Sequence, residues 1–252
     1  MRLIRPFSVS LFILFFIVVT GRAAEVVRVY GPGGPAPAMK DAAKAFEEKT
    51  GVRVDVTAGP NDKWLAKAKK DADVIYSGSE NMMTSFIRAM KGTILEGTVR
   101  PIYIRPATLL VRPGNPKNIT GIRDLMKPGA RVMVVEGAGQ IGLWEDILGR
   151  LGDVNAIRSF RSNIVEFAPN SGEAKERWTK DSSIDAWLIY NIWEVANQSI
   201  ADQVQIEPDL RIWRDCGVAL TKRGSGSAKA KDFVAFLESA EGRAIFEKWG
   251  WK

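Results

Sequence analysis

Four short turns in this 252-residue chain combine glycine with hydroxyl, amide or carboxylate side chains in a pattern that suits anion binding. They are GPGG at 31–34, SGSE at 77–80, GAGQ at 137–140 and NSG at 170–172. Each follows a predicted strand and precedes a predicted helix. Such a turn leaves backbone N–H groups unpaired at the positive end of the helix dipole, where they can bind an anion. In open α/β sheets, ligands gather at this edge. We therefore predict that the four turns converge on a compact ligand with several oxygens.

The predicted ligand-binding residues lie in these turns and at the end of the later strand DAWLIY. They are Gly33, Gly34, Ser77, Gly78, Ser79, Gly137, Ala138, Gly139, Gln140, Asn170, Ser171, Gly172 and Tyr190. Asn170 or Ser171 also suits the N-cap of the following helix. Glu80, Glu136, Glu145 and Asp146 could supply carboxylates for acid–base chemistry. Glu145 and Asp146 are adjacent on a helix, so the two cannot face the same point.

Two other interpretations of the third turn stay open. Residues 137–142 match the dinucleotide pattern G-x-G-x-x-G, and Glu166 follows near the expected acidic position. However, Glu136 directly before the first glycine would repel a pyrophosphate, and the helix is short. The turn could also be purely structural, with no ligand. The first turn lacks the lysine and hydroxyl of a P-loop, so nucleotide hydrolysis is not supported.

The composition is ordinary for a soluble globular protein, with 46% hydrophobic and 26% charged residues. The chain has no histidine, which excludes a Ser-His-Asp triad, Cys-His catalysis and histidine-ligated zinc. Its single cysteine, Cys216, excludes a disulfide framework. We expect neither a metal nor another cofactor.

The first residues have the features of a secretory signal peptide. Arg2 and Arg5 precede an apolar run at 7–19, and small residues precede a cleavage site after Ala23 or Ala24. The run is shorter than the ~20 apolar residues of a membrane span, although an uncleaved anchor is the alternative. We therefore expect an exported, periplasmic protein.

The formal net charge of +7 is spread along the chain, and the signal segment contributes three of the arginines. No run of lysines and arginines has the form that follows a nucleic-acid backbone. A mildly basic mature chain with anion-ready turns favours a small anionic ligand, and no nucleic acid is expected.

The order strand, glycine turn, helix, strand predicts an α/β fold. An extended segment near 103–112 and a return near 212–220 imply two lobes joined by two strands. Lobe 1 would be discontinuous, with residues 24–104 and 218–252, and lobe 2 would comprise 105–217. Two such lobes facing each other across a hinge would form a cleft that closes.

Several segments resemble the accessory colonization factor C family of periplasmic solute-binding proteins. They are VYGPGGPAPAMKDAAKAFEEKTG (29–51), DADVIYSGSE (71–80), VVEGAGQIGLWEDILGR (134–150), FRSNIVEFAPNSGEAK (160–175) and FEKWGW (246–251). The resemblance implies the type II periplasmic-binding-protein fold, related to the sulfate and molybdate binders. In that fold each lobe has a mixed, mostly parallel sheet flanked by helices, with a two-strand hinge.

The resemblance also implies a function and a charge for the site. The cleft turns would hold an oxyanion, a di- or tricarboxylate, or a phosphorylated small acid. Arg105 matches the family's arginine in the crossing strand and would supply a fixed, bidentate positive charge. The ligand would pass to an ABC-type or other membrane transporter, or to a sensor.

One departure from the family prevents transfer of the ligand's identity. Some members carry a Ser/Thr/Gly-rich insertion between the GAG turn and the WED helix, where this chain has only residues 140–142. The fold also resembles periplasmic aconitate isomerase, which moves a proton along an allylic tricarboxylate without a cofactor. For that alternative, Glu80, Glu136 or Tyr190 would carry the proton.

Overall fold

The computed structural model describes residues 26–252. The predicted signal peptide and its cleavage site lie outside the described residues. Within residues 26–252, none of the helices has both the length and the apolar character needed to cross a membrane.

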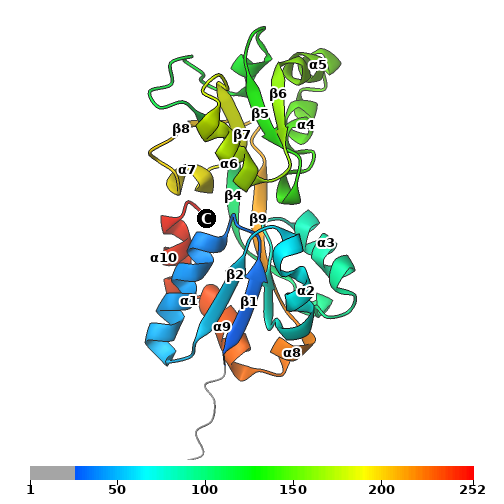
Figure 1. Cartoon of the computed structure of the whole chain (residues 1–252), viewed down its shortest axis with the longest axis vertical. Helices are drawn as coiled ribbons and strands as arrows, with labels where there is room; N and C mark the ends of the chain where they lie inside the picture. The colour runs from blue at the N-terminus through cyan, green and yellow to red at the C-terminus, as the bar shows by residue number, and fades with distance from the viewer. Residues whose placement is uncertain (1–25) are drawn as a thin grey trace, which may run out of the picture.

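Two lobes lie one above the other, with two long strands running between them (Figure 1). The connecting strands are β4 (Arg100–Val111) and β9 (Trp213–Leu220), which pair antiparallel and place Arg105 opposite Arg214. The lobe boundaries expected at 104/105 and 217/218 stay a prediction.

Lobe 1 combines the first part of the chain with its last three helices. Its elements are β1 (Val27–Gly31), α1 (Ala36–Thr50), β2 (Val54–Ala58), α2 (Asn61–Asp71), β3 (Val74–Tyr76), α3 (Glu80–Met90), η1 (Glu96–Thr98), α8 (Lys222–Ser225), α9 (Ala228–Leu237) and α10 (Ala240–Lys248). Phe46 of α1 packs against Phe233 and Phe236 of α9, with ring centroids 5.4 and 5.5 Å away. This aromatic contact joins the distant segments in one apolar core.

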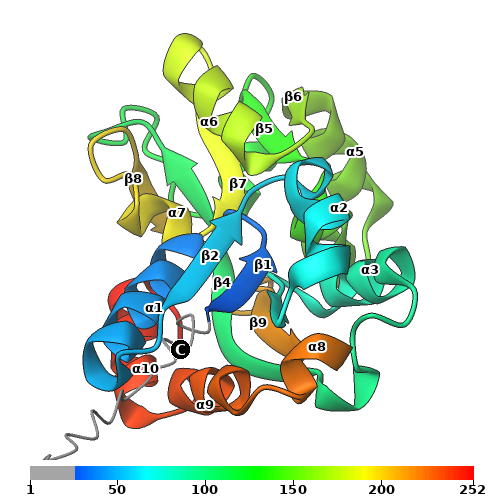
Figure 2. The same ribbon diagram turned by 60° about the horizontal axis from the view of Figure 1, so that its bottom comes forward.

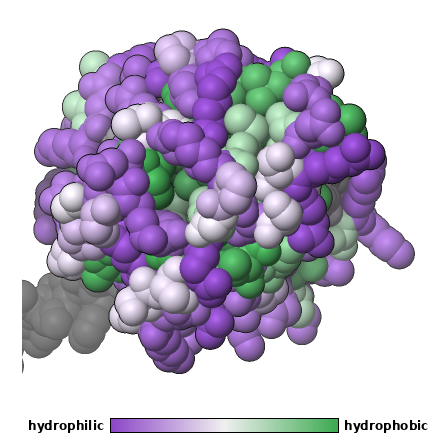
Figure 3. Space-filling model, turned by 90° about the horizontal axis from the view of Figure 1, so that it is seen from above, coloured by the Kyte–Doolittle hydropathy of each residue, from purple (hydrophilic) through white to green (hydrophobic). Residues whose placement is uncertain are grey.

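Lobe 2 is formed by the middle of the chain. Its elements are η2 (Ile122–Met126), β5 (Val132–Val135), η3 (Ala138–Gln140), α4 (Leu143–Leu148), η4 (Gly149–Leu151), α5 (Val154–Asn163), β6 (Ile164–Ala168), α6 (Ser171–Lys180), β7 (Ala186–Tyr190), α7 (Ile192–Val195) and β8 (Asp202–Gln205). The sequence pattern did not predict α5, which begins at the N-cap Asp153 and buries Phe160. Seen from above, the surface in Figure 3 is mostly hydrophilic, with apolar residues in small groups.

The strand order is β2-β1-β3-β9-β4-β7-β5-β6, and β8 also pairs with β4. In lobe 1, β1 pairs parallel with β2 and β3, and in lobe 2, β5 pairs parallel with β6 and β7. Residues 100–106 of β4 pair with β9, whereas 107–111 pair with β7. One strand therefore belongs to the sheets of both lobes, and the predicted two-lobe α/β fold is confirmed.

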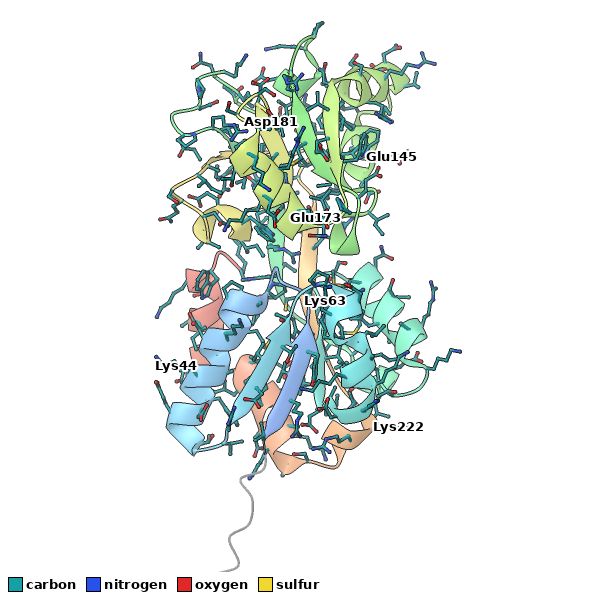
Figure 4. All side chains as sticks on the ribbon, in the orientation of Figure 1. Lys44, Lys63, Glu145, Glu173, Asp181 and Lys222 are labelled. Carbon is teal, nitrogen blue, oxygen red and sulfur yellow. The ribbon has the colours of Figure 1, made fainter. Side chains whose placement is uncertain are left out.

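The parallel strands of each lobe direct their carboxyl ends toward the gap between the lobes. In Figure 4, Glu173 of α6 marks the lower end of lobe 2, and Lys63 of α2 marks the upper end of lobe 1. The turns at these strand ends are therefore the segments that meet between the lobes.

Candidate functional site

A cleft of about 420 Å³ separates the two lobes. Its lining is formed by turns from both lobes, the hinge strand β4 and the end of β7. The lining residues are Pro32, Gly33, Gly34, Pro35, Gly59, Pro60, Asn61, Asp62, Gly78, Met82, Arg105, Gly139, Gln140, Pro169, Asn170, Ser171, Gly172, Tyr190 and Trp193. A space of this size is typical of sites for small molecules, which span about 300–1,000 Å³.

Arg105 supplies the positive charge of this cleft. Its side chain is 4% exposed and donates hydrogen bonds to the carbonyl oxygens of Gly78 (2.9 Å) and Asp215 (3.1 Å). Its Nε atom is buried and has no hydrogen-bond partner among the described residues. The guanidinium lies over the rings of Tyr190 and Trp251, 4.0 and 4.5 Å from their centroids. These contacts fix the guanidinium in one orientation.

The charge of Arg105 is not neutralised by an ion pair within residues 26–252, since the guanidinium donates both of its hydrogen bonds to backbone carbonyl oxygens. Burial lowers the pKa of Arg105, although an arginine stays protonated in proteins. Asp215 is the nearby carboxylate, and burial raises its pKa, which opposes its ionisation. A buried cation with an unpaired N–H group is well suited to an incoming anion.

Tyr190 positions the glycine turn of lobe 2. It is the last residue of β7, and its hydroxyl donates to the carbonyl oxygen of Gly139 at 2.8 Å. Burial raises the pKa of the Tyr190 phenol. Its proton is therefore held in a structural hydrogen bond.

The turn at 137–140 packs tightly against the start of α6. A Cβ atom on Gly137 would overlap the carbonyl oxygen of Pro169, so only glycine fits there. Gln140 is 5% exposed and donates from Nε2 to Ser171 Oγ at 2.7 Å. Its Oε1 atom is buried with no partner in the described chain. The carboxamide thus has spare hydrogen-bonding capacity in the wall of the cleft.

The first turn of α6 offers free backbone donors. The side chain of the N-cap Asn170 accepts from the Glu173 amide at 3.0 Å. The amides of Ser171 and Gly172 have no acceptor within the described chain, as expected for the first two residues of a helix. Both residues line the cleft, where the helix dipole adds positive potential.

The turn before α1 combines backbone donors with prolines. The amides of Gly33 and Gly34 have no acceptor within the described chain, and both residues line the cleft. Pro32 and Pro35 line it as well and have no backbone N–H. Pro35 is the N-cap residue of α1, and its side chain makes no capping hydrogen bond. The start of α1 therefore offers two free amides beside two apolar rings.

The SGSE turn presents few polar groups to the cleft. Ser79 is the N-cap residue of α3 and accepts from the Met82 amide at 3.2 Å. Ser77 is fully buried and its hydroxyl has no partner in the described chain. Gly78 lines the cleft and presents its carbonyl to Arg105.

The two lobes are in contact across the cleft. A Cβ atom on Gly139 of lobe 2 would lie 2.9 Å from Ser79 Oγ of lobe 1. A Cβ atom on Gly34 would lie 3.6 Å from Ile192 of lobe 2. Turns of both lobes therefore touch at the rim of the cleft.

Most of the predicted ligand-binding residues meet in this cleft. Those that line it are Gly33, Gly34, Gly78, Arg105, Gly139, Gln140, Asn170, Ser171, Gly172 and Tyr190. Ser77, Ser79 and Gly137 lie behind the lining, and Ala138 belongs to η3. Glu80 and Glu136 are exposed and do not line the cleft. Ligand contact by any of these residues stays a prediction.

Sequence reasoning missed part of the lining. Pro60, Asn61 and Asp62 follow β2 at the start of α2, so their position at a strand end was an available signal. Trp193 of the lining gave no such signal, and neither did Trp251, which contacts Arg105 but is not part of the lining. Trp251 reaches Arg105 from the far end of the chain, through backbone pairing of Lys252 with Ile104.

Comparison with known proteins places this geometry in a family. Searching curated protein sequences gives no match. Among solved structures, L-phospholactate-bound PEB3 is 40% identical, with a TM-score of 0.85 over 90% of this chain and 99% of that chain. Peb3 from Campylobacter jejuni is 39% identical, with a TM-score of 0.84 and the same shares.

A more distant structure shares the fold alone. The sulfate-binding protein SubI from Mycobacterium tuberculosis is 16% identical, with a TM-score of 0.75 over 90% of this chain and 86% of that chain. The family model described as "Bacterial extracellular solute-binding protein" matches residues 27–252, which is the whole of both lobes. This chain therefore belongs to the bacterial extracellular solute-binding proteins.

Proposed function

We propose that this chain is a periplasmic binding protein that captures a small organic anion, with a carboxylate or phosphate group, in the interlobe cleft. It then presents the closed complex to a membrane transporter or a sensor. The observation that carries this function is the buried guanidinium of Arg105, which lines the cleft without an ion-pair partner among the described residues.

The energetics of Arg105 favour an anionic ligand. Burying a cation without a counter-charge is unfavourable, and a bound carboxylate or phosphate would supply both the charge and an acceptor for Nε. The free amides of Ser171 and Gly172 would meet a second oxygen group of the ligand.

The wall of the cleft favours an organic anion over an inorganic oxyanion. Sulfate or molybdate is best held by donors on every side, because its oxygens point in all directions. Here prolines 32, 35, 60 and 169 occupy the turns and supply no N–H groups. Met82 and Trp193 add further apolar surface, which suits a carbon skeleton.

The relationship to PEB3 supports the same ligand class. The similar structure contains L-phospholactate, a three-carbon acid with one phosphate and one carboxylate group. At 40% identity over nearly the whole of both chains, a related ligand is the natural first candidate for this protein. Assignment to the accessory colonization factor C family within the solute-binding proteins is part of this proposal.

Isothermal titration calorimetry tests the function directly. The ligands are L-phospholactate, phosphoglycerate, citrate, trans-aconitate, sulfate and molybdate. We expect at least one organic acid to bind more tightly than sulfate and molybdate. Arg100→Gln is the matched control for Arg105 variants, because Arg100 lies on the same strand but pairs with Glu238 outside the cleft. Absence of heat with every anion would refute the proposal.

The isomerase alternative has less support from the geometry. Burial and the neighbouring Asp215 charge raise the pKa of Glu80, which suits a proton carrier, but this side chain is exposed and does not line the cleft. Glu136 is also exposed, and the Tyr190 proton is held by Gly139. Incubation of trans-aconitate with the protein, followed by assay for the cis isomer, decides the question; we expect no turnover.

A further inference from the structure

A second concavity lies away from the interlobe cleft, beside the edge strand of the lobe 1 sheet. It has a volume of about 470 Å³ and is lined by α1, α2, β1 and β2. In Figure 2, β2 lies in front, with α1 on one side and α2 on the other. We call this concavity the edge groove. None of its lining residues lines the cleft, so it is independent of the ligand site.

The edge groove is lined by a strand with unpaired backbone groups. β2 is the last strand of the sheet order and pairs with β1 only. The Val27 amide donates to Arg53, and the Gly59 amide donates to Gly31. Because backbone groups alternate between the two sides of a strand, the N–H and C=O groups of Val54 and Val56 point away from β1. They form no hydrogen bonds within residues 26–252, and both residues line the groove.

The charge around this edge is mostly positive. Five basic side chains line the edge groove, against only two acidic ones, Glu47 and Asp55. Asp55 is already paired with Arg53 at 2.9 Å. Lys40 of α1 and Lys67 of α2 form no ion pair in the described part of the chain, and they come from the two helices that flank β2.

We propose that the edge groove binds an extended acidic segment of a partner protein, which adds to β2 as a further strand. The free N–H and C=O groups of Val54 and Val56 would pair with its backbone. Lys40 and Lys67 would contact acidic side chains on its two faces, because successive side chains of a strand point to opposite sides.

Other occupants of the edge fit the charges less well. A second copy of this chain would bring the same basic side chains face to face, and lysines beside an edge strand discourage such pairing. The N-terminal residues 1–25 carry Arg2, Arg5 and Arg22 but only one acidic residue, so they do not complement the groove either. The same lysines would attract an acidic segment, although they repel a second basic edge.

Fluorescence anisotropy with labelled peptides tests this site on the full chain. The probe is an eight-residue peptide in which pairs of valines alternate with pairs of glutamates, so that glutamates lie on both faces of the added strand. The comparison peptide replaces every glutamate with lysine. We expect the acidic peptide to bind at low ionic strength and to dissociate as salt is added. We expect no binding of the basic peptide. Hydrogen exchange at the amides of Val54 and Val56 should slow when the acidic peptide binds.

Two variants and one control separate the effect of charge from that of backbone pairing. Lys40→Glu combined with Lys67→Glu should weaken the acidic peptide at least about tenfold, which corresponds to the loss of two favourable charge contacts. Lys175→Glu combined with Lys222→Glu makes the same change in net charge on exposed residues elsewhere and should leave binding unchanged. Val56→Pro removes one outward N–H but keeps every charge, and should also weaken binding.

Binding is compared only among variants whose thermal unfolding midpoint matches that of the unmodified chain. If Val56→Pro is unfolded, Val54→Pro replaces it. Failure of the acidic peptide to bind at low salt would overturn the site. Equal binding of both peptides, or equal effects of the two lysine pairs, would do the same. Unchanged binding by a folded proline variant would overturn strand addition.

Discussion

At the scale of single residues, the buried charge of Arg105 is energetically unfavourable, and a bound anion would compensate it. It is buried among aromatic rings and backbone carbonyls, and no carboxylate of the described chain pairs with it. Replacing an uncompensated buried charge with an apolar side chain of similar volume is often neutral or stabilising. Affinity and unliganded stability should therefore respond in opposite ways to its removal.

We expect Arg105→Met to weaken binding of the organic anion by at least about 30-fold, or roughly 2 kcal/mol, because a charge-assisted contact is lost. Without ligand, the unfolding midpoint should stay the same or rise. Titration calorimetry and scanning calorimetry measure the two effects. Unchanged affinity would show that the ligand is bound by a different charge. A large loss of stability without ligand would contradict the claim that the buried charge of Arg105 is unfavourable.

Asp215 should make stability depend on pH. Burial raises the pKa of its carboxyl group above the ordinary 3.8, and its Oδ2 atom is buried without a partner in residues 26–252. The folded state therefore binds the proton more tightly than the unfolded state, so this group lowers stability as pH rises through its folded pKa. We expect Asp215→Asn to raise the unfolding midpoint at pH 7, with the gain disappearing at acidic pH. Scanning calorimetry from pH 3 to 8 measures this, and a gain that grows toward low pH would contradict it.

Sequence patterns could predict residue types at the site better than their orientations. Arg105 is conspicuous because it is the one charge within an otherwise apolar segment. The family resemblance then implied that it supplies the positive charge of the site. Their place in a glycine turn predicts Ser77 and Ser79 as ligand-binding residues, yet one is buried behind the cleft and the other caps α3. Which way a side chain points around a turn depends on packing that no local pattern encodes.

At the scale of elements, the glycine turns position the site by close backbone contacts. Gly137 lets β5 enter η3 directly against the start of α6, and Gln140 then reaches Ser171. This arrangement was predictable in outline, because a strand followed by a glycine turn and a helix places the turn at the sheet edge. The start of α1 follows the same pattern, with free amides at Gly33 and Gly34, but Pro32 and Pro35 beside them supply no N–H groups.

Gly137→Ala should therefore damage both the fold and the site. The added Cβ would overlap the Pro169 carbonyl and separate the two turns, at a cost of about 1–3 kcal/mol of stability. The matched control is Gly149→Ala, where an added Cβ meets no atom within 4 Å and φ is −59°. Urea unfolding and ligand titration compare the pair. Equal effects of the two substitutions would refute the importance of this contact.

At the scale of the whole molecule, closure depends on small residues where the lobes meet. Gly139 of lobe 2 lies against Ser79 of lobe 1, and Gly34 of lobe 1 lies against Ile192 of lobe 2. A ligand favours closure only through contacts that it makes in the closed form and not in the open form. The two-lobe arrangement followed from the strand order, whereas the identity of these rim contacts could not be derived from it.

We expect Gly139→Val to hold the lobes apart without unfolding them. Its φ of −81° is accessible to valine, but the added side chain would occupy the space of Ser79 Oγ and Gly78 O. Small-angle scattering with saturating ligand should show a larger radius of gyration than for the unmodified protein, and affinity should fall. A variant that compacts normally on ligand addition would show that the lobes meet by a different contact.

The position of Arg105 on a strand shared by both sheets has a consequence for inhibition. Because β4 pairs with strands of both lobes, Arg105 lies near the axis about which the lobes would rotate, so its surroundings should change little on closure. A short anion that reaches only the guanidinium would then bind without favouring closure. Under the proposed function, such a compound would be an antagonist, because it would compete with the cargo yet give a transporter or sensor no closed complex to recognise.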